Sequence, residues 1–305
     1  MSGDIAESIA MILVKNIVGA QIYGSDIRPD LINTNLCANS FKSPSADDPT
    51  FFQWLNEILS KNRFDFYIPC SEDELLIISN FSDSQLANIN SHTKIVWAGA
   101  SVIKSLASKS NTSSFLNSID LNPPKLFSKY EEIIDFPVVI KPDVGRGSKN
   151  IFVCFNQLQV KAALALVENP VIQEYIPSPE TEYTCVVYRN LKFETVCIVF
   201  HRYLSGGLTS WAEVVNDPII KNICVRIANE LNLNGSINIQ LRKSKDRIAI
   251  FEINPRFSST VFMRSLVNFN DVLWSLEIGN PAREYFEEIH FGAKFKVVKT
   301  ANRLK

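Results

Sequence analysis

The chain has 305 residues, 46% of them hydrophobic, which is long enough for roughly two domains of about 150 residues, each with a core of its own. Its 31 Lys and Arg nearly balance 32 Asp and Glu, so the net charge of −1 lacks the basic excess that favours binding to nucleic acid or an anionic membrane. The six Cys are scattered without a Cys-x-x-Cys pair or a Cys/His cluster, which argues against zinc and disulfides and favours a reducing, cytoplasmic location.

Neither a membrane span nor a secretory signal is expected from the sequence. No apolar stretch approaches the roughly 18 residues that a transmembrane helix needs. Asp4 and Glu7 precede the first Lys, which is the wrong order of charges for a signal peptide.

The first hundred residues alternate between predicted helices and strands. Apolar residues at helical spacing predict a helix over 4–15. The elements predicted after it are strands at 20–24, 66–68 and 95–97, with helices at 48–60 and within 73–90. This alternation predicts a parallel sheet with helices on its faces. Such a unit should open with a strand, but only two residues precede Gly3, so we expect one strand of this sheet to be missing.

The pattern changes after residue 98. Two short helices, at 99–107 and 111–118, lead to a Pro-rich turn at 122–124, which makes 99–124 a helical linker. Beyond it we expect paired strands at 136–141 with 151–155, 182–189 with 192–200, and 235–242 with 247–253, and helices at 156–168 and 217–231. Paired strands with interspersed helices indicate an α+β architecture.

A first candidate site follows the apolar strand that ends at Lys141. The turn after it contains Gly145, Gly147 and Ser148, whose backbone N–H groups can approach the oxygens of an anion closely. This arrangement suits a phosphate. The alternative is an ordinary hairpin with a glycine turn, since one Gly-x-Gly is weak evidence.

A second candidate lies at the end of the apolar segment 171–176. Gln173, Glu174 and Ile176 could present polar groups to the edge of a purine, and Glu182 could accept hydrogen bonds from ribose hydroxyls. The alternative is a surface carboxylate at a strand end.

The third candidate is a predicted hairpin that carries three oxygen-bearing side chains. Glu252 and Asn254 are two residues apart and therefore share a strand face. A three-residue loop at 244–246 would set Gln240 opposite Ile250, on the same face as Glu252, whereas a two-residue loop would reverse the face. One carboxylate and two amides suit Mg²⁺ when phosphates and water complete its coordination. The alternative is a solvated strand face.

Two arginines complete the candidates. Arg256 follows the metal-site residues and supplies a permanent cation for charge that develops on a transferred group. Arg202 ends a strand, and we expect its two-pronged guanidinium to clamp a carboxylate substrate. We also expect a polar, Gly-rich loop at 205–209, directly after this strand end. For Arg202 the alternative is an exposed side chain in a mobile loop.

In this order and at these separations, the three segments resemble the ATP-grasp superfamily, and most closely the carbamoyl-phosphate synthase large subunit. Glu252-x-Asn254-Pro255-Arg256 is the most specific match. The segments 23–26 and 68–74 resemble the pre-ATP-grasp domain of that group, and 108–112 resembles the Asp-Lys segment at the entry of the ATP domain.

The resemblance implies an ATP-grasp fold with four parts. These are a Rossmann-like pre-ATP-grasp domain over 1–98, the helical linker over 99–124, a small lid subdomain over 125–178 and a C-terminal subdomain over 179–305.

The resemblance also implies roles for individual residues. Lys109 and Lys141 would hold the ATP phosphates under a loop formed by Gly145, Gly147 and Ser148; Gln173, Glu174 and Ile176 would frame the adenine; Glu182 would bind ribose; Gln240, Glu252 and Asn254 would hold Mg²⁺ or Mn²⁺; and Arg256 would act at the reacting centre. The sequence departs from the family in three places: the loop lacks the glycine that usually follows the Ser at 148, Ser108 stands where Asp is usual, and Ser259 stands where Gly is frequent.

The implied activity is ligation, in which a carboxylate attacks ATP to give an acyl phosphate that an amine or similar nucleophile opens. The partners would be small molecules, with a homodimer left open. One alternative is a regulatory or non-catalytic ATP-binding protein of the same fold, and another is phosphate transfer to a hydroxyl.

Overall fold

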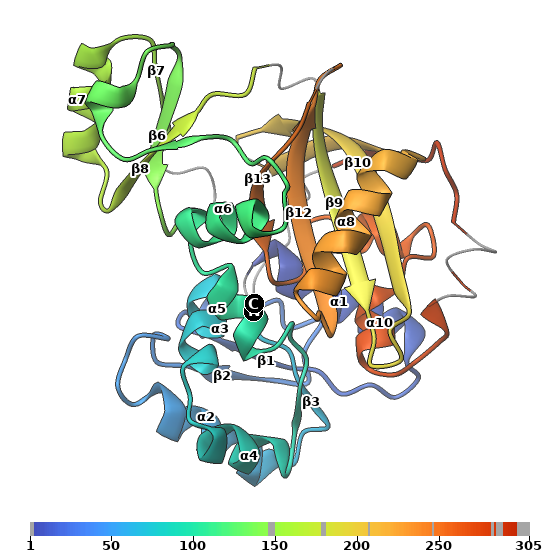
Figure 1. The fold of residues 1–305 in the computed structure, drawn as a ribbon. Helices are drawn as coiled ribbons and strands as arrows, with labels where there is room; N and C mark the ends of the chain where they lie inside the picture. Colours follow the sequence, from blue (N-terminus) through green and yellow to red (C-terminus); the bar gives the residue numbers. More distant parts are fainter. Residues whose placement is uncertain are drawn as a thin grey trace.

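The structure is a computed structural model that describes residues 3–145, 150–177, 181–206, 208–245, 247–281, 284 and 289–297. Helices and sheets are mixed throughout this part of the chain, and Figure 1 shows a small sheet, a large curved sheet and a helix-rich N-terminal part grouped around a common centre. The α/β and α+β prediction is confirmed. No helix among the described residues combines the length and apolar character that crossing a bilayer requires.

The N-terminal part contains parallel strand pairs, as the alternation predicts. Its elements are α1 (Asp4–Asn16), β1 (Tyr23–Asp26), a 3-10 helix (Pro29–Leu31), β2 (Asn39–Lys42), α2 (Phe51–Asn62), β3 (Phe66–Tyr67), α3 (Glu72–Ser79), α4 (Asp83–Asn90) and β4 (Lys94–Ile95). β1 pairs with β2 and β3 pairs with β4, each in parallel. Within the described residues no strand joins the two pairs into one sheet.

Helix α1 attaches the N-terminal part to the C-terminal part of the chain. Its buried residues Ile9 and Ile12 pack in a cluster with Val261 and Val272. These two valines belong to α9 (Val261–Ser265) and α10 (Asp271–Ser275). The apolar stripe predicted from sequence therefore faces a distant segment of the chain rather than only its neighbouring strands.

The linker helices are α5 (Ala100–Ser105) and α6 (Lys109–Ser118). Helix α6 begins two residues earlier than predicted because Ser108 caps it, its hydroxyl accepting a hydrogen bond from the Asn111 N–H at 3.0 Å. This cap places Lys109 in the first turn of α6, beside the end of a strand of the small sheet.

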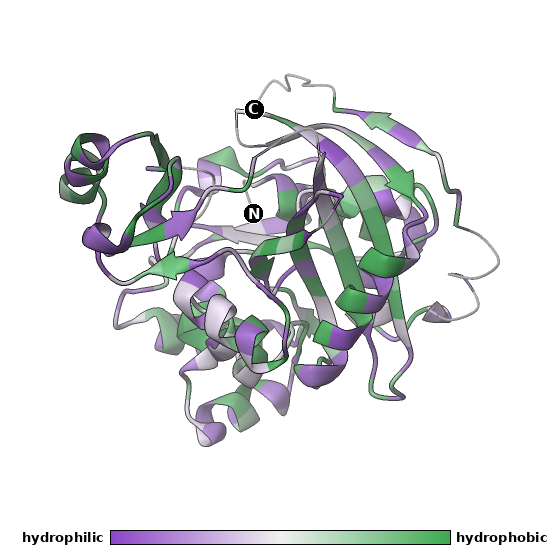
Figure 2. Ribbon diagram, turned by 45° about the horizontal axis from the view of Figure 1, so that its top comes forward, coloured by the Kyte–Doolittle hydropathy of each residue, from purple (hydrophilic) through white to green (hydrophobic). Residues whose placement is uncertain are grey.

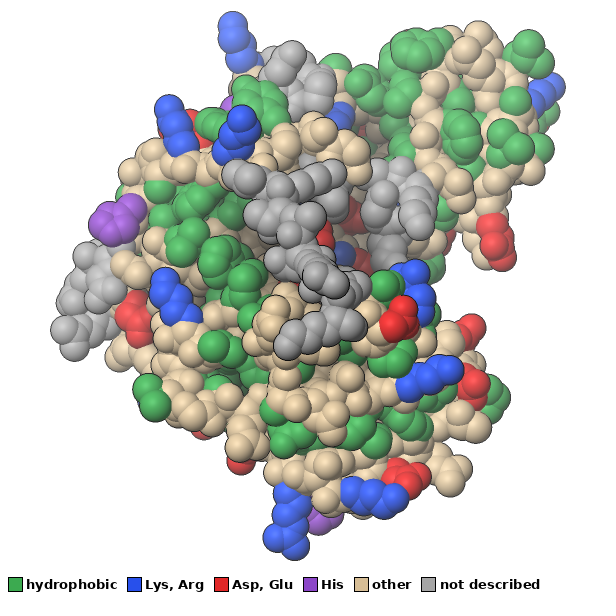
Figure 3. Space-filling model, turned by 180° about the vertical axis from the view of Figure 1, so that it is seen from behind, with side chains coloured by type: hydrophobic (Ala, Val, Ile, Leu, Met, Phe, Trp, Pro, Cys, Tyr) green, Lys and Arg blue, Asp and Glu red, His purple; other side chains and the backbone are tan. Residues whose placement is uncertain are grey.

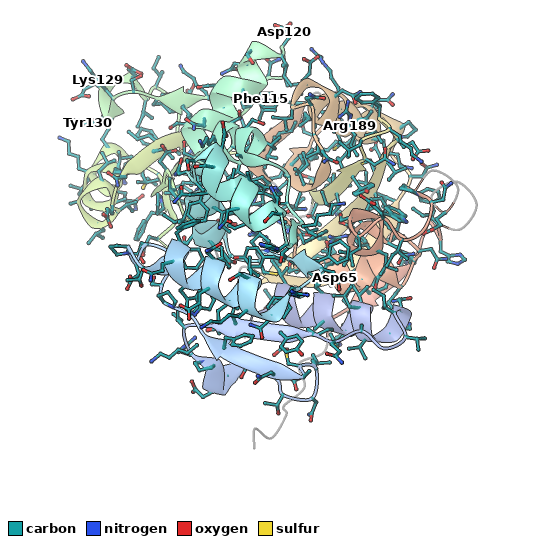
Figure 4. The ribbon with its side chains drawn as sticks, turned by 90° about the horizontal axis from the view of Figure 1, so that it is seen from below. Asp65, Phe115, Asp120, Lys129, Tyr130 and Arg189 are labelled. Atoms are coloured by element: carbon teal, nitrogen blue, oxygen red, sulfur yellow. The ribbon has the colours of Figure 1, made fainter. Side chains whose placement is uncertain are left out.

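The small sheet has the strand order β5-β8-β6-β7. Its elements are β5 (Leu126–Phe127), a 3-10 helix (Tyr130–Glu132), β6 (Val138–Pro142), β7 (Phe152–Cys154), α7 (Gln157–Leu166) and β8 (Pro170–Glu174). Ile140 and Ile172 pack against Val160 and Ala163 of α7, which lies against this sheet in Figure 1. Figure 4 labels Lys129 and Tyr130 on this side of the molecule and Arg189 on the opposite side.

The large sheet has the strand order β13-β12-β9-β10-β11-β14. Its elements are β9 (Glu182–Arg189), β10 (Thr195–Ser205), β11 (Leu208–Val215), α8 (Pro218–Glu230), β12 (Gly235–Lys243), β13 (Ile248–Asn254) and β14 (Lys294–Lys296). The paired strands predicted from sequence are all present. Figure 2 shows hydrophobic residues prevailing along the central strands beside the helix that covers them.

Both faces of the large sheet are buried. On one face, Val187 and Val199 pack against Ile227 of α8. On the other face, Tyr188 and Phe200 pack in a cluster with Phe269 and Trp274. Burial on both sides explains why β9 and β10 read as almost continuous apolar runs.

The prediction of a loop over 205–209 is wrong. Strand β10 continues to Ser205 and pairs with β11, with only the connecting turn between them. The Tyr203 and Trp211 rings pack across this hairpin with their centroids 5.2 Å apart and their planes tilted by 42°. Such aromatic cross-strand pairs stabilise a ladder, which is why the strand persists through a stretch with polar residues.

Candidate functional site

A cavity of about 1300 Å³ lies where the N-terminal part, the small sheet and the large sheet meet. Acidic and basic side chains are visible in a hollow between the upper and lower parts of the molecule in Figure 3. All predicted site residues that the structure describes line the cavity: Lys109, Lys141, Gly145, Gln173, Glu174, Ile176, Glu182, Arg202, Gln240, Glu252, Asn254 and Arg256. Gly147 and Ser148 lie outside the described residues.

On one face of the large sheet, the side chains change from apolar to polar along the length of the strands. Tyr188 and Val186 on β9 belong to the apolar cluster of that face, and Thr184 and Glu182 follow at the same two-residue spacing. Phe200 and Arg202 show the same change on β10. The apolar half of the face therefore forms core, and its continuation forms a wall of the cavity.

The register of the β12–β13 hairpin differs from the prediction. Lys243 pairs with Ile248, so the loop has four residues rather than three. Continued without interruption, this register would set Gln240 opposite Phe251, on the wrong face. A bulge between Gln240 and Leu241 shifts the pairing by one residue and places Gln240 opposite Glu252. Gln240 and Glu252 thus share a face, as predicted, but a bulge rather than a three-residue loop brings them together.

Glu252 and Asn254 are available as oxygen ligands. In the described part of the chain their side chains make no hydrogen bond, although Asn254 is only 7% exposed. Gln240 is already engaged, because its Oε1 accepts from Arg202 Nη2 at 2.7 Å. No group of three or more His, Cys, Asp or Glu among the described residues could hold a metal ion, so a cation here would need amide, phosphate and water oxygens as well.

Two lysines lie together at the end of β6. The ammonium of Lys109 donates to the carbonyls of Asp143 and Gly145 at 3.2 and 3.3 Å. The Asp143 side chain accepts from the Ser110 N–H at 2.8 Å, which fixes α6 against the strand end. Lys141 is 6% exposed, and burial lowers its pKa to about 8, against the opposing effect of Glu252 and with a further lowering by Lys109. A bound phosphate would supply a negative counter-charge to both ammonium groups.

Arg202 is buried, so the alternative of an exposed loop arginine is wrong. Its Nε and Nη2 donate to Oε1 of Glu182 at 3.2 and 2.8 Å. The other carboxylate oxygen of Glu182 accepts from Nε and Nη2 of Arg242 at 3.2 and 3.0 Å. Glu182 is thus shared by two guanidinium groups, and it holds Arg202 beside the metal-site candidates.

The segment predicted to face a purine is tied to the large sheet. Glu174 accepts from Arg247 at 2.6 Å and from the Lys125 N–H at 2.9 Å. Burial acts to raise the pKa of Glu174, but these hydrogen bonds outweigh it and lower the pKa below its usual range. The Ile176 carbonyl accepts from Arg242, and Gln173 is 4% exposed at the cavity wall. The carboxylate of Glu174 therefore serves structure, while its backbone edge stays beside the cavity.

Arg256 is held by a residue from the N-terminal part. Its Nε donates to Glu72 Oε1 at 2.8 Å, and its Nη2 also contacts that oxygen. Its Nη1 donates to the Phe257 carbonyl at 3.0 Å. The predicted catalytic arginine is thus oriented across the cavity toward α3.

A buried ion pair supports the turn that follows Arg256. Arg264 donates to both carboxylate oxygens of Asp271 at 2.7 and 2.8 Å, and Nη1 of Arg264 donates to the Ser258 hydroxyl at 3.1 Å. Ser236 donates to the same carboxylate at 2.6 Å. With all of its partners present, this pair anchors residues 256–260 without leaving a buried charge unpaired.

Sequence reasoning missed three polar residues beside these candidates. Asn238 and Arg242 flank Gln240 at two-residue spacing, so strand alternation alone could have placed them on its face. Asn238 donates to the Thr184 hydroxyl at 2.7 Å and to the Cys185 carbonyl at 3.1 Å. Glu72 carries no comparable signal, because 184 residues separate it from Arg256.

A family model and a curated protein each match part of this chain in sequence. A family model described as "ATP-grasp in the biosynthetic pathway with Ter operon" matches residues 167–301. The D-alanine–D-alanine ligase of Fusobacterium nucleatum subsp. nucleatum is 33% identical over 86 residues, which span 28% of this chain and 30% of that ligase.

Solved structures resemble nearly the whole chain. The biotin carboxylase domain of Hydrogenobacter thermophilus 2-oxoglutarate carboxylase, in complex with MgADP, ADP and bicarbonate, matches 96% of this chain and 71% of its own with a TM-score of 0.73 and 13% identity. The N5-carboxyaminoimidazole synthetase of Staphylococcus aureus, complexed with ADP, matches 92% and 77% with a TM-score of 0.70 and 16% identity. At these identities the likeness establishes the fold.

Proposed function

We propose that the chain is a member of the ATP-grasp superfamily and acts as an ATP- and Mg²⁺-dependent ligase, joining a carboxylate to an amine through an acyl phosphate. The observation that carries the proposal is the convergence, in one cavity, of Lys109, Lys141 and Arg256 with the oxygen ligands Glu252 and Asn254. Two anions must meet in this reaction, and closely placed cations lower their repulsion.

In the first step, a carboxylate oxygen attacks the γ-phosphorus of ATP, and the bond from that phosphorus to the bridging oxygen breaks to release ADP. Lys109 and Lys141 would hold phosphate oxygens, with Lys141 charged in that complex because the phosphates offset the cost of its burial. Arg256 would contact both the attacking carboxylate and the transferred phosphoryl group, and would bind the negative charge on them.

In the second step, the amine attacks the acyl carbon and inorganic phosphate leaves with the electrons of the carbon–oxygen bond. The amine nitrogen loses a proton as the new carbon–nitrogen bond forms. Arg202, held by Glu182 and hydrogen-bonded to Gln240, would orient the carboxyl group through both steps.

Glu252 and Asn254 would hold Mg²⁺ or Mn²⁺, with Gln240 contributing if its oxygen is shared with Arg202. When bound, the cation would neutralise phosphate charge and orient the γ-phosphate for in-line attack. The donor set fits a hard cation, because all three residues offer oxygen and only one of them is charged. The scattered cysteines, without a Cys-x-x-Cys pair, support the cytoplasmic location that we propose.

The direct test follows ADP formation with pools of carboxylates and amines, added separately and together. ADP release that needs both pools supports ligation. Tight ATP binding without ADP release under any pool would favour a regulatory nucleotide-binding protein. A stable phosphorylated alcohol would instead show phosphate transfer to a hydroxyl and contradict the proposal.

A further inference from the structure

The contact between Arg256 and Glu72 has the form of a bound carboxylate. Two guanidinium nitrogens, Nε and Nη2, contact one carboxylate oxygen, and such charge-assisted contacts are the kind that arginine makes with acidic ligands. Glu72 lies in the first turn of α3, and Arg256 lies after β13, so the contact joins two separate parts of the chain. Both residues also line the cavity that contains the metal-site candidates.

The Arg256–Glu72 ion pair is more open than the Arg202–Glu182 pair of the same cavity. The side chains of Arg256 and Glu72 keep 17% and 22% of their surface exposed, whereas the Glu182 side chain keeps 4%. Glu182 also uses both of its oxygens on two arginines, whereas in the described part of the chain Glu72 accepts from Arg256 through Oε1 alone. A soluble anion can therefore reach the Arg256 fork more easily than it can reach the fork of Arg202.

Among the neighbouring acids of α3, Glu74 is directed elsewhere. Its carboxyl group accepts a hydrogen bond from the Tyr67 hydroxyl, and burial raises its pKa. Cys70, close to both, has its pKa raised to about 12 by burial. Glu74 is therefore engaged behind α3, and Glu72 is the residue of this helix whose carboxylate forms the ion pair with Arg256.

We propose that Glu72 occupies the position of the substrate carboxylate on Arg256 in the free protein, and that an incoming carboxylate exchanges with it. The inference rests on the proposed function for the name of the substrate, but the exchange itself is a property of the ion pair. It assigns Glu72 as an internal competitor that sets the affinity for acidic ligands. Uncharged analogues of a carboxylate substrate would then be unable to release Arg256.

The test removes the charge of Glu72 and keeps its shape. Acetate is the probe, titrated into the full chain without nucleotide at constant ionic strength, and the Arg256 Nε–H resonance is followed by NMR after assignment with Arg256→Lys. We expect Glu72→Gln to bind acetate about threefold more tightly than the wild type, because the competing charge is gone. Glu72→Ala should show the same direction and serves if the amide variant folds poorly.

Asp83→Asn is the matched control. Asp83 occupies the first turn of α4 as Glu72 does in α3, and it is exposed away from the cavity. Its replacement should leave acetate affinity unchanged. Unchanged or weaker acetate binding in both Glu72 variants would overturn the proposal and make Glu72 a structural tie. Since no turnover is measured, failure of the ligase proposal would appear only in the ADP assay.

Discussion

Gln240 and Glu252 face each other across the β12–β13 ladder, and a bulge in that ladder puts them there. The bulge matters because a shift of one residue reverses every side chain of a strand. Without it, the Gln240 side chain and the Glu252 carboxylate would point to opposite faces of the sheet. The irregularity thus creates the patch of oxygens on which the proposed metal site depends.

Lys141 should make nucleotide binding sensitive to alkaline pH. Its pKa of about 8 in the folded chain means that it loses its charge as the pH rises through that value. We expect the affinity for ATP to fall between about pH 7 and 9, as measured by calorimetry. Lys141→Arg should bind ATP with little change over this range, because a guanidinium stays charged. An equal decline in both proteins would contradict the assignment.

The lowered pKa of Lys141 also makes the free energy of unfolding depend on pH. The folded pKa of Lys141 lies below its ordinary value of 10.5, so the unfolded chain binds more protons between about pH 8 and 10.5. The contribution of Lys141 to the free energy of unfolding therefore rises with pH in this window, and the cost of its burial is fully present below it. Denaturant titrations of the wild type and Lys141→Met should differ more at pH 7 than at pH 10.

Glu182 should be among the most sensitive residues for stability. Glu182→Gln leaves the guanidinium groups of Arg202 and Arg242 without their shared counter-charge in a buried place, which we expect to cost about 3 kcal/mol or more. Glu57→Gln, which breaks an exposed ion pair with Lys61, should change the free energy of unfolding by about 0.5 kcal/mol or less. Similar losses for the two variants, measured by urea unfolding, would contradict the role of the double pair.

Arg202 should affect the carboxylate substrate more than ATP. Once the assay has identified a carboxylate, Arg202→Lys should raise its KM about tenfold, because an ammonium cannot reproduce the fork that contacts Glu182 and Gln240. The KM for ATP should change less. An unchanged KM for the carboxylate would remove Arg202 from substrate binding.

Much of the fold follows from local patterns in the sequence. The hydrophobic spacing of 4–15 predicts α1, and the apolar runs predict β9 and β10, because periodicity and burial are linked directly. Strand β2 is not predicted, since Asn39-Ser40-Phe41-Lys42 has neither alternation nor β-branched residues. Its pairing with β1 depends on tertiary contacts that no local pattern encodes.

The candidate site also combines features that local sequence patterns predict with features that depend on tertiary contacts. Glu252 and Asn254 can be placed on one face from their spacing alone, and the structure agrees. The loop length and the bulge between Gln240 and Leu241 cannot be derived, because a turn sequence such as Ser244-Lys245-Asp246 permits several registers. The burial of Arg202 depends on Glu182, which comes from the adjacent strand, and the contact of Arg256 with Glu72 depends on how distant parts of the chain meet.

The most direct test of the central claim is the Mg²⁺-dependent formation of ADP by Glu252→Ala, compared with Glu213→Ala. Glu213 lies on β11 of the same sheet and outside the cavity lining, so its removal controls for the loss of a strand carboxylate. We predict that Glu252→Ala folds like the wild type by circular dichroism and loses about 100-fold or more in turnover, while Glu213→Ala keeps it. Turnover by folded Glu252→Ala at the wild-type rate would contradict the account.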